Sequence, residues 1–600
     1  MNPTQTAPSA ADVFTSREKA RLKYWAERYP AKVMGLVEAL REVQDWKGEV
    51  PVAADAHIAE LFGVTRHRVR EIVTFYPYFS HVKAGKYRVA VCRNLSCRLG
   101  GCETVLERLE KALGVPEGEA TKDGLFSWEA SECLGACDHA PAFAVNDELL
   151  GKATPEAVDA ALSACRSGKA PMAGPSVEPA APVCDKALLT KHFGEPELHT
   201  LAVYRRFGGY AAWEKAKAME PAAITVEMKK SNVRGLGGAG FPVGMKWETV
   251  PPKSKRDVPH ALVANADESE PGCFKDRVIM ERNPHALVEG LQIAARAIDA
   301  DHVYIFLRGE YARQRRVLEA AIEEARAAGL LARDVKVMCG ANAYISGCDT
   351  ALLETMEGKK AWPRQPPPFP TVAGLMGWPT VVNNVETLMM VAQVIAVGGE
   401  AFAAAGVPRS GGLRCFSVSG HVERPGVYEF PQGTSLDDIL AAAGGMKGGR
   451  PLKAVIPGGT STPVLTAEEA KGVKMDFDSL RAKGTFAGAG GVIFLDDTVD
   501  MVDVLYVIER FLWTESCGQC TPCREGSGWA TRVLQRIREG RGDASDPANL
   551  TRLGENITGR VICALGDTVG MVATAMIKKF PEDFAKRAAA RAAAPGASRG

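Results

Sequence analysis

The spacing of hydrophobic and polar positions changes along the chain and divides it into segments with different expected folds. Residues 17–85 carry apolar stripes at helical spacing, as in VMGLVEALREVQ and HIAELFGVTRHRVREIVTFY. Residues 86–165 alternate short apolar runs such as YRVAVC with amphipathic stretches such as GCETVLERLEKALG. The pattern predicts a helical segment followed by a small α/β domain.

The remainder of the chain predicts three further domains. Residues 166–185 are rich in Pro, Gly, Ala and Ser, which is typical of a linker. In residues 186–405, apolar runs such as ALVANAD and HVYIFLR alternate with helical patterns, which predicts a mostly parallel sheet. Residues 406–495 have short strands punctuated by Gly and Pro, and residues 496–595 return to helical spacing. The predicted fold class is therefore multidomain α/β.

Composition narrows the classes of function. The 600 residues carry a formal net charge of +1, so neither nucleic acid nor an anionic membrane surface is an expected partner. The start, MNPTQTAPSAADVF, lacks the apolar core of a signal peptide. The longest apolar run, TLMMVAQVIAVGG, has 13 residues, fewer than the roughly 20 that span a bilayer. We therefore expect a cytoplasmic protein without direct membrane insertion.

Four of the 15 cysteines form a first group of candidate metal ligands: Cys92, Cys97, Cys133 and Cys137. Four residues separate the first pair and three separate the second, and each pair follows a predicted strand. Structural zinc usually takes cysteines two residues apart, whereas these wider spacings suit the two irons of a [2Fe–2S] cluster. A zinc site or four unrelated thiols are the alternatives.

A second group combines three closely spaced cysteines with a distant one: Cys517, Cys520, Cys523 and Cys563. The closely spaced three, in ESCGQCTPCREG, resemble a loop that wraps three corners of a [4Fe–4S] cluster, with the fourth ligand supplied from elsewhere. Zinc is the weaker alternative because this spacing is awkward around a tetrahedral ion.

The segment VRGLGGAGFPVGMKW contains a G-x-G-x-x-G pattern at Gly235, Gly237 and Gly240. A dinucleotide-binding turn needs a strand before this pattern and a helix after it. Here the preceding residues look helical, and Pro242 interrupts the residues after the pattern, so an ordinary Rossmann turn is not predicted. Backbone N–H groups of such a loop can still approach a phosphate or a flat ring, with Lys246 as a nearby cation. A plain flexible loop is the alternative.

Two further segments place polar side chains beside the ends of predicted elements. The strand in VANADESEPGCFKDR ends in four such residues: Asn265, Asp267, Glu268 and Glu270. Carboxylates repel phosphate, so hydroxyl, amide or amine groups are the expected partners, although a solvated loop or a hard-cation site also fits. PTVVNNVETL carries three short polar residues before a helix, a position suited to anion binding: Asn383, Asn384 and Thr387.

Together these segments resemble a known family over almost the whole chain. The supporting strings, in family order, are RGLGGAGFPVGMKW, NADESEPGCFKDR, PPPFPTVAGLMGWPTVVNNVETL, FSVSGHVERPGVYE, and ESCGQCTPCREG with ICALGD. Residues 17–165 resemble the 24-kDa-type subunit of respiratory NADH dehydrogenase (complex I), and residues 186–595 resemble its 51-kDa-type flavoprotein subunit. The fused arrangement is also similar to the diaphorase subunits of NAD-reducing hydrogenases and NAD-dependent formate dehydrogenases.

The resemblance implies four domain types: a thioredoxin-like [2Fe–2S] domain after the N-terminal helices, a Rossmann-like FMN and NAD(H) domain, a β-grasp (SLBB) domain and a helical [4Fe–4S] domain. It implies the eight cysteines above as cluster ligands and Glu270 beside the nicotinamide, in the catalytic position. The implied flavin and nucleotide contacts are Gly235, Gly237, Gly238, Gly240, Phe241, Gly244, Lys246, Asn265, Asp267, Glu268, Glu270, Tyr344, Gly347, Asn383, Asn384 and Thr387.

The implied function is hydride transfer between NAD(H) and FMN, followed by single-electron transfer through the clusters, in a complex I-type NADH:quinone oxidoreductase. The alternatives are a diaphorase subunit of a soluble hydrogenase or formate dehydrogenase, and, from another class, a non-catalytic scaffold with structural zinc. The implied partners are other subunits of a redox complex, through which this protein would lie peripheral to the inner membrane. One departure concerns nucleotide binding: where the family has Y-x-C-G-E-E-T-A, this chain has YISGCDTA, with Ser346, Cys348 and Asp349.

Metal and flavin content separates the redox function from the zinc scaffold. We expect the purified protein to contain iron and acid-labile sulfide, because both cysteine groups have spacings that favour iron–sulfur clusters, and FMN, because the resemblance implies it. Elemental analysis and the visible spectrum measure this directly. Stoichiometric zinc without iron or flavin would rule out the redox function.

Overall fold

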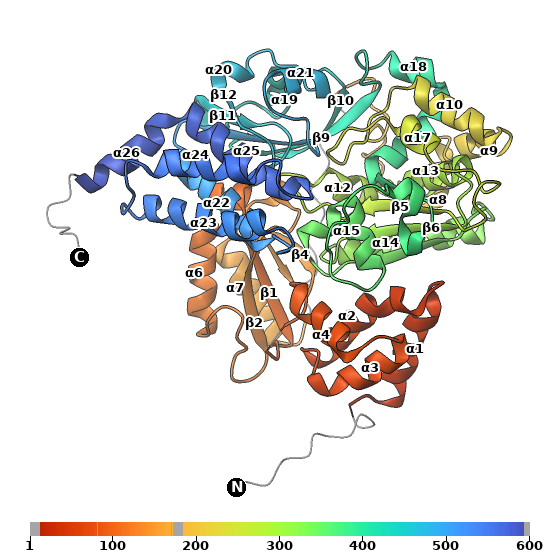
Figure 1. Ribbon diagram of the computed structural model, residues 1–600, viewed down its shortest axis with the longest axis horizontal. Helices are drawn as coiled ribbons and strands as arrows, with labels where there is room; N and C mark the ends of the chain where they lie inside the picture. Colours follow the sequence, from red (N-terminus) through yellow and green to blue (C-terminus); the bar gives the residue numbers. More distant parts are fainter. Residues whose placement is uncertain (1–12, 81, 170, 172–183, 593–600) are drawn as a thin grey trace, which may run out of the picture.

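The computed structural model describes residues 13–80, 82–169, 171 and 184–592. In Figure 1 the chain runs through an N-terminal helical region, a small α/β region, a larger α/β region, a second sheet region and a final group of helices. Within the described ranges, no helix is long and apolar enough to cross a membrane. Most of the predicted linker lies outside the described residues.

The N-terminal region is built from four helices: α1 (Ser16–Arg28), α2 (Leu36–Lys47), α3 (Asp55–Phe62) and α4 (Arg66–Phe75). A capping box starts α1, because the Thr15 hydroxyl accepts from the Glu18 N–H and the Glu18 carboxylate accepts from the Thr15 N–H. The apolar stripe of α1 buries Leu22 and Trp25. These helices therefore form a packed unit, as the helical spacing predicts.

The small α/β region is a four-stranded sheet in the order β2-β1-β3-β4. β1 pairs in parallel with β2 and antiparallel with β3. Thr154 caps the last helix, and Pro155 occupies its first turn. The elements are β1 (Tyr87–Cys92), α5 (Leu95–Leu99), α6 (Cys102–Leu113), β2 (Phe126–Ser131), β3 (Ala142–Val145), β4 (Glu148–Lys152) and α7 (Pro155–Arg166).

The larger α/β region contains an all-parallel sheet in the order β7-β6-β5-β8. Its strands are β5 (Ala261–Ala266), β6 (His302–Leu307), β7 (Val335–Cys339) and β8 (Thr380–Asn384). The carboxyl ends of parallel strands meet at one edge, where ligands bind in open α/β sheets. The helices are α8 (Leu201–Arg206), α9 (Ala211–Lys217), α10 (Pro221–Lys230), α11 (Val243–Glu248), α12 (Lys275–Arg282), α13 (Pro284–Ala297), α14 (Ala312–Ala327), α15 (Asp349–Met356), α16 (Pro370–Ala373), α17 (Val385–Val397) and α18 (Gly399–Ala403).

The N-terminal helices cover the outer edge of β7. Tyr29 donates from its hydroxyl toward the Val337 carbonyl at 3.5 Å. The Cys339 N–H donates to Glu38 at 3.4 Å, and Arg41 donates to the carbonyl just after the strand at 2.7 Å. Side chains therefore satisfy backbone groups that an edge strand otherwise leaves unpaired.

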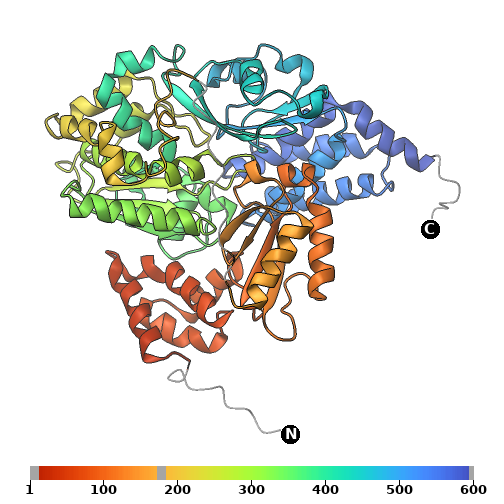
Figure 2. The same cartoon turned by 180° about the vertical axis from the view of Figure 1, so that it is seen from behind.

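The second sheet region and the final helices complete the molecule. The mixed sheet has the order β10-β9-β13-β11-β12. Figure 2 shows the small α/β region between the N-terminal helices and the C-terminal helices. The elements are β9 (Leu413–Gly420), β10 (Gly426–Pro431), α19 (Leu436–Ala442), β11 (Leu452–Ile456), β12 (Leu465–Thr466), α20 (Ala467–Ala470), α21 (Phe477–Ala482), β13 (Gly491–Asp496), α22 (Met501–Thr514), α23 (Thr521–Arg538), α24 (Asp546–Ile557), α25 (Ala564–Lys579) and α26 (Pro581–Ala592).

One buried carboxyl in α22 is an exception to the apolar packing of the C-terminal helices. Glu509 is 0% exposed, and neither of its carboxyl oxygens makes a hydrogen bond within the described residues. Burial raises the pKa of Glu509 well above its ordinary value of 4.5, so the folded protein keeps this group neutral.

The burial of Glu509 makes the free energy of unfolding depend on pH. Above pH 4.5 the unfolded chain releases the Glu509 proton while the folded protein retains it, so the free energy of unfolding falls as pH rises. The loss is at most about 1.4 kcal/mol per pH unit, up to the folded-state pKa. Glu509→Gln removes this titration. We expect its free energy of unfolding in urea to exceed that of the wild type by more at about pH 8 than at about pH 5.

The exposed Glu555→Gln is the matched control for removing one carboxylate from the same group of helices. An equal difference between Glu509→Gln and the wild type at both pH values would contradict the prediction.

Candidate functional site

The Gly-rich loop is anchored at the carboxyl end of β8. The Leu236 N–H donates to the Thr387 hydroxyl at 2.9 Å, and the Gly235 N–H donates to the Phe241 carbonyl at 2.9 Å. A Cβ at Gly237 would lie 3.0 Å from the Cβ of Asn384. The loop is therefore a folded turn packed on the sheet, and the flexible-loop alternative does not describe it.

Space remains beside one glycine of this loop. Gly238 has φ +136°, and a Cβ there would meet no atom within 4 Å. Gly240 has φ +65° and faces Phe477, while a Cβ at Gly244 would meet Lys229 at 2.6 Å. Backbone is therefore presented to open space at Gly238 and is closely packed on both sides of it, which is the shape of a cradle for a ligand.

The polar residues around the end of β8 hold the site together. Lys246 Nζ donates to the Val382 carbonyl at 2.7 Å and pairs with Asp349 at 3.0 Å. Trp247 Nε1 donates to Asn383 Oδ1 at 2.9 Å. The side chain of Asn383 is thus occupied by protein.

Asn384 caps α17 with its side-chain oxygen, which accepts from the Thr387 N–H at 3.4 Å. Its Nδ2 donates to Asp276 at 2.6 Å. Asn384 therefore competes with a bound anion for the helix N-terminus, and the predicted contacts of these residues with FMN stay predictions.

Asn265 and Asp267 lie together at the carboxyl end of β5. Asn265 Nδ2 donates to the Gly347 carbonyl at 2.8 Å, and its Oδ1 accepts from the Asp267 N–H at 3.2 Å. A Cβ at Gly347 would lie 3.2 Å from the Asp267 carbonyl oxygen. Burial raises the pKa of Asp267 to about 7. This strand end therefore presents a carboxyl group that exchanges a proton near neutral pH.

Glu270 is held by partners from two regions of the chain. Its carboxylate accepts from the Tyr344 hydroxyl at 2.6 Å and from the Ser461 N–H at 2.7 Å. Burial raises the pKa of Glu270, while these hydrogen bonds act in the opposite direction. The predicted catalytic position of Glu270 is consequently rigid, and its role stays a prediction.

Tyr344 also connects this strand end to the second cysteine group. Its N–H donates to Glu515 at 3.0 Å, and its ring contacts Phe511 at 4.9 Å between centroids. The next residue, Ile345, lines the cavity that contains the cysteines. The turn at 344–347 is therefore a wall shared by the predicted flavin site and the predicted cluster site.

One small cavity brings together the four cysteines of the second group: Cys517, Cys520, Cys523 and Cys563. The Ile562 N–H points to the Cys520 sulfur at 3.4 Å. Apolar walls come from residues such as Leu565 and Val561. Four sulfurs around one apolar cavity, with a backbone donor, form a donor set suited to a [4Fe–4S] cluster.

The four cysteines of the first group are all buried: Cys92, Cys97, Cys133 and Cys137. Hydrogen bonds with the thiols of Cys137 and Cys92 lower the pKa of Cys133 well below its ordinary value, so these sulfurs are neighbours. Backbone N–H groups of Gly135 and Ala142 each point to a sulfur at 3.4 Å. This donor set fits a [2Fe–2S] cluster. In the described ranges, no three or more His, Cys, Asp and Glu side chains are arranged to hold a single metal ion.

Two buried arginines of the larger α/β region hold the loop that carries Cys133 and Cys137. Arg277 pairs with Asp138 at 2.6 Å, with both side chains buried, and donates from Nε to the Gly135 carbonyl at 3.0 Å. Arg308 donates to the Cys133 carbonyl. The first cysteine group is therefore fixed to the sheet that carries the predicted flavin site.

Glu268 belongs to the same contact between the small and the larger α/β regions. Its carboxylate accepts from the N–H groups of Asp276 at 2.9 Å and Arg277 at 2.8 Å, and from the Tyr311 hydroxyl at 3.2 Å. Burial raises the pKa of Glu268 to about 8. Its predicted contact with a cofactor stays a prediction, whereas the observed partners favour a role in joining the two regions.

Sequence reasoning missed several residues that build the site: Arg277, Arg308, Tyr311, Ser461 and Glu515. Arg277 lies in NADESEPGCFKDR, one of the strings that carry the family resemblance, so its position was a usable signal. Glu515 likewise begins ESCGQCTPCREG, another of these strings. No comparable pattern marks Arg308, Tyr311 and Ser461, because their partners lie far away in the chain.

Gly135 tests the contact between the two regions. Its φ is +63°, and a Cβ there would meet the Tyr311 hydroxyl at 2.3 Å. We expect Gly135→Ala to displace the cysteine loop, at a cost of about 1–3 kcal/mol from overpacking, and to alter or remove the [2Fe–2S] EPR signal. Gly124→Ala is the matched control, because φ at Gly124 is +68° but no atom lies within 4 Å.

Adding Tyr311→Phe to Gly135→Ala removes the hydroxyl oxygen that the new Cβ would meet first. The double variant should therefore recover part of the [2Fe–2S] EPR signal. An unchanged signal in Gly135→Ala alone would show that the Tyr311 contact does not position the loop.

Four family models match the chain in the order that the sequence predicts. They are the thioredoxin-like [2Fe-2S] ferredoxin (22–166), the Nuo51 FMN-binding domain (228–393), the SLBB domain (415–465) and the NADH-ubiquinone oxidoreductase-F iron-sulfur binding region (503–587). The predicted fold class and the predicted FMN, [2Fe–2S] and [4Fe–4S] cofactors are thereby confirmed.

Curated relatives and solved structures agree with these models. An F-type subunit of NADH-quinone oxidoreductase from Rhizobium meliloti (strain 1021) is 46% identical over 66% of this chain and 96% of its own length. The F-type subunit from Streptomyces coelicolor is 43% identical over 66% of this chain and 90% of its own. A chain of an NAD+-reducing [NiFe]-hydrogenase in the H2-reduced state superposes with a TM-score of 0.80, at 30% identity and 92% coverage of both chains. The chain therefore belongs to the family of F-type NADH-quinone oxidoreductase subunits, joined in one polypeptide to a thioredoxin-like [2Fe–2S] ferredoxin unit.

Proposed function

We propose that this chain exchanges electrons between NAD(H) and the iron–sulfur subunits of a larger complex. The observation that carries the proposal is the shared wall at 344–347, which has Glu270 on one side and the cavity of the second cysteine group on the other. FMN, when bound, takes electrons as a pair from NADH and gives them up singly, as iron–sulfur clusters require. A short separation between the two sites favours that transfer.

The residues of the chain hold the bound cofactor and nucleotide in position and keep water out of the site. The Gly-rich loop presents backbone beside Gly238, and Asp267 and Glu270 lie at the carboxyl end of β5. Partly buried hydrogen bonds hold Asp267 and Glu270, so little reorganisation accompanies binding. None of these side chains is required to act as an acid or base on the nicotinamide.

The fused arrangement favours a partner complex like that of an NAD+-reducing hydrogenase. The hydrogenase chain covers 92% of this chain, whereas the F-type relatives cover 66% of it. We infer a diaphorase-type role with partner subunits that hold the second half-reaction, and the complex I-type role is the other candidate. Co-purification from the native source, followed by metal analysis for nickel or molybdenum, distinguishes these complexes.

Cys348 and Asp349 depart from the family sequence. Under this proposal the chain still binds NAD(H). Asp349 pairs with Lys246 at 3.0 Å and is 46% exposed, so a carboxylate is still presented beside the loop. NADH-dependent bleaching of the flavin absorbance in the reconstituted protein tests this point. Absence of bleaching by NADH would contradict NAD(H) binding at this site.

Cys563 tests the electron exit. We expect Cys563→Ala to lose or convert the [4Fe–4S] cluster and to slow electron transfer to the partner subunits, because it removes one of four ligands. Bleaching of the flavin by NADH should persist, since the variant leaves Asp267 and Glu270 unchanged. Cys165→Ala, in the core of the small α/β region, is the matched control. A normal four-iron EPR signal in Cys563→Ala would refute the ligand assignment.

A further inference from the structure

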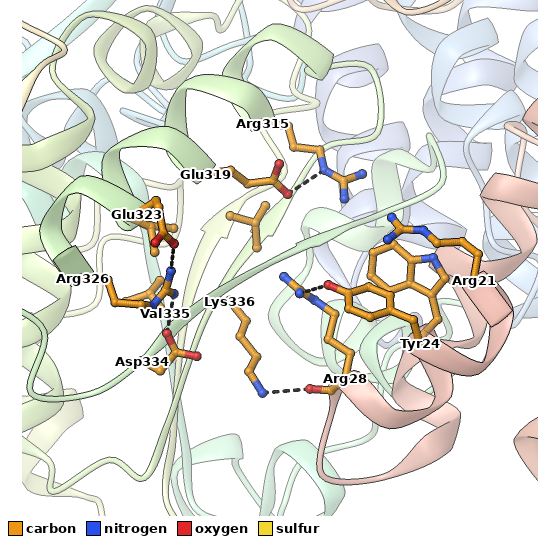
Figure 3. Close-up of a pocket in the computed structure, with 13 residues that line it drawn as sticks. Arg21, Tyr24, Arg28, Arg315, Glu319, Glu323, Arg326, Asp334, Val335 and Lys336 are labelled. Carbon is orange, nitrogen blue, oxygen red and sulfur yellow. Dashed lines mark hydrogen bonds and ion pairs between the residues drawn. The ribbon is translucent and has the colours of Figure 1, made fainter. Parts of the chain in front are cut away.

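A cavity lies between the N-terminal helices and the larger α/β region, away from the cysteine groups and the carboxyl ends of the strands (Figure 3). Its volume is about 370 Å³, within the roughly 300–1,000 Å³ of small-molecule sites. One wall is α1, the opposite wall is α14, and the start of β7 lies between them. The lining residues that matter here are Arg21, Trp25, Arg28, Arg315, Arg326 and Lys336.

The cavity has an excess of positive charge. Five cationic and three acidic side chains line it, a formal excess of two. All three acids are ion-paired on the α14 side: Arg315 pairs with Glu319 at 3.0 Å, and Arg326 pairs with Glu323 and, at 2.6 Å, with Asp334. Arg21 pairs at 2.7 Å with Glu42, which lies outside the lining. Within the described residues, neither Arg28 nor Lys336 has a carboxylate at ion-pairing distance, and Lys336 Nζ donates to the Arg28 carbonyl at 2.8 Å.

Two buried donors at the cavity also lack an acceptor. Trp25 is 2% exposed, and its Nε1 makes no hydrogen bond within the described residues. The buried Nε of Arg28 likewise makes none there. Indole and guanidinium groups donate only, and buried donors in folded proteins almost always have an acceptor. Both groups therefore need an acceptor oxygen, from a bound ligand or from water.

Aromatic rings hold the guanidinium groups of the α1 wall in place. The Arg21 guanidinium lies 4.7 Å from the Tyr24 ring centroid and 5.0 Å from that of Trp25. Arg28 lies 5.5 Å from the Tyr24 ring and donates to its hydroxyl. Guanidinium groups held in this way recognise phosphate or carboxylate oxygens with little loss of entropy.

We propose that this cavity binds a small anion carrying two or more phosphoryl groups. Arg28 and Lys336, near α1, are the lining cations without a carboxylate partner among the described residues (Figure 3). A guanidinium group has five N–H donors, so Arg315 and Arg326 on α14 still have donors for a second anionic group besides those used in their ion pairs. The bound anion bridges the N-terminal helices and the flavin-binding region. The ligand therefore stabilises the docking of the helices against β7, at a site separate from that for NAD(H).

Isothermal titration calorimetry and thermal unfolding of the full chain with inorganic pyrophosphate and with GDP test the proposal. We expect binding that raises the unfolding midpoint with ligand concentration and weakens with added salt. Arg28→Gln and Lys336→Gln should each weaken binding about tenfold, because each removes a charge-assisted hydrogen bond. Glu319→Gln should strengthen binding, because it removes a negative charge from the lining.

Arg206→Gln, an exposed arginine of the same region outside the cavity, is the matched control and should leave binding unchanged. NADH-dependent ferricyanide reduction, retained in all variants, verifies that each is folded. Pyrophosphate binding as tightly as GDP identifies the phosphoryl groups as the recognised feature, and tighter binding of GDP adds the nucleoside. No binding at millimolar concentrations, or equal affinities in the wild type, Arg28→Gln and Lys336→Gln, would overturn the proposal.

Discussion

The buried ion pair between Arg277 and Asp138 is the contact on which the arrangement of the redox sites depends. Both side chains are removed from water, so separating the two regions would leave two uncompensated charges. Removing one partner of such a pair costs about 3–5 kcal/mol. The same arginine also holds the backbone at Gly135, between Cys133 and Cys137. A buried charge pair that is costly to separate therefore holds the loop of Cys133 and Cys137 against the sheet that carries the predicted flavin site.

The second cysteine group is joined to the predicted flavin site by a different kind of contact. Tyr344 donates through its hydroxyl to Glu270 and through its backbone to Glu515, two residues before Cys517. Burial raises the pKa of Glu515 to about 8, so this acceptor lies in a water-poor environment. One aromatic residue thus joins three segments that are distant in the sequence, and contacts of the described residues hold both cysteine groups against a single sheet.

Much of this arrangement could be predicted from residue types and spacing. The cysteine intervals, with Cys563 as the distant member, identified two sets that the structure brings together, and the alternation of strands and helices predicted the parallel sheet. What spacing does not encode is the direction of a side chain. Glu268 follows Asp267 in the chain, yet its carboxylate turns to the N–H groups of α12. Arg308 contacts a loop that lies 175 residues earlier, a distance over which no local pattern gives information.

The contact of the N-terminal helices with β7 has a consequence for how this polypeptide can be divided. Tyr29, Glu38 and Arg41 occupy the backbone positions at which another strand would otherwise pair. A flavin-binding fragment made without these helices would present free hydrogen-bonding groups along the edge of a parallel sheet, which is a template for strand addition between molecules. The helices of the ferredoxin unit therefore cover an edge at which copies of the sheet would otherwise be able to pair.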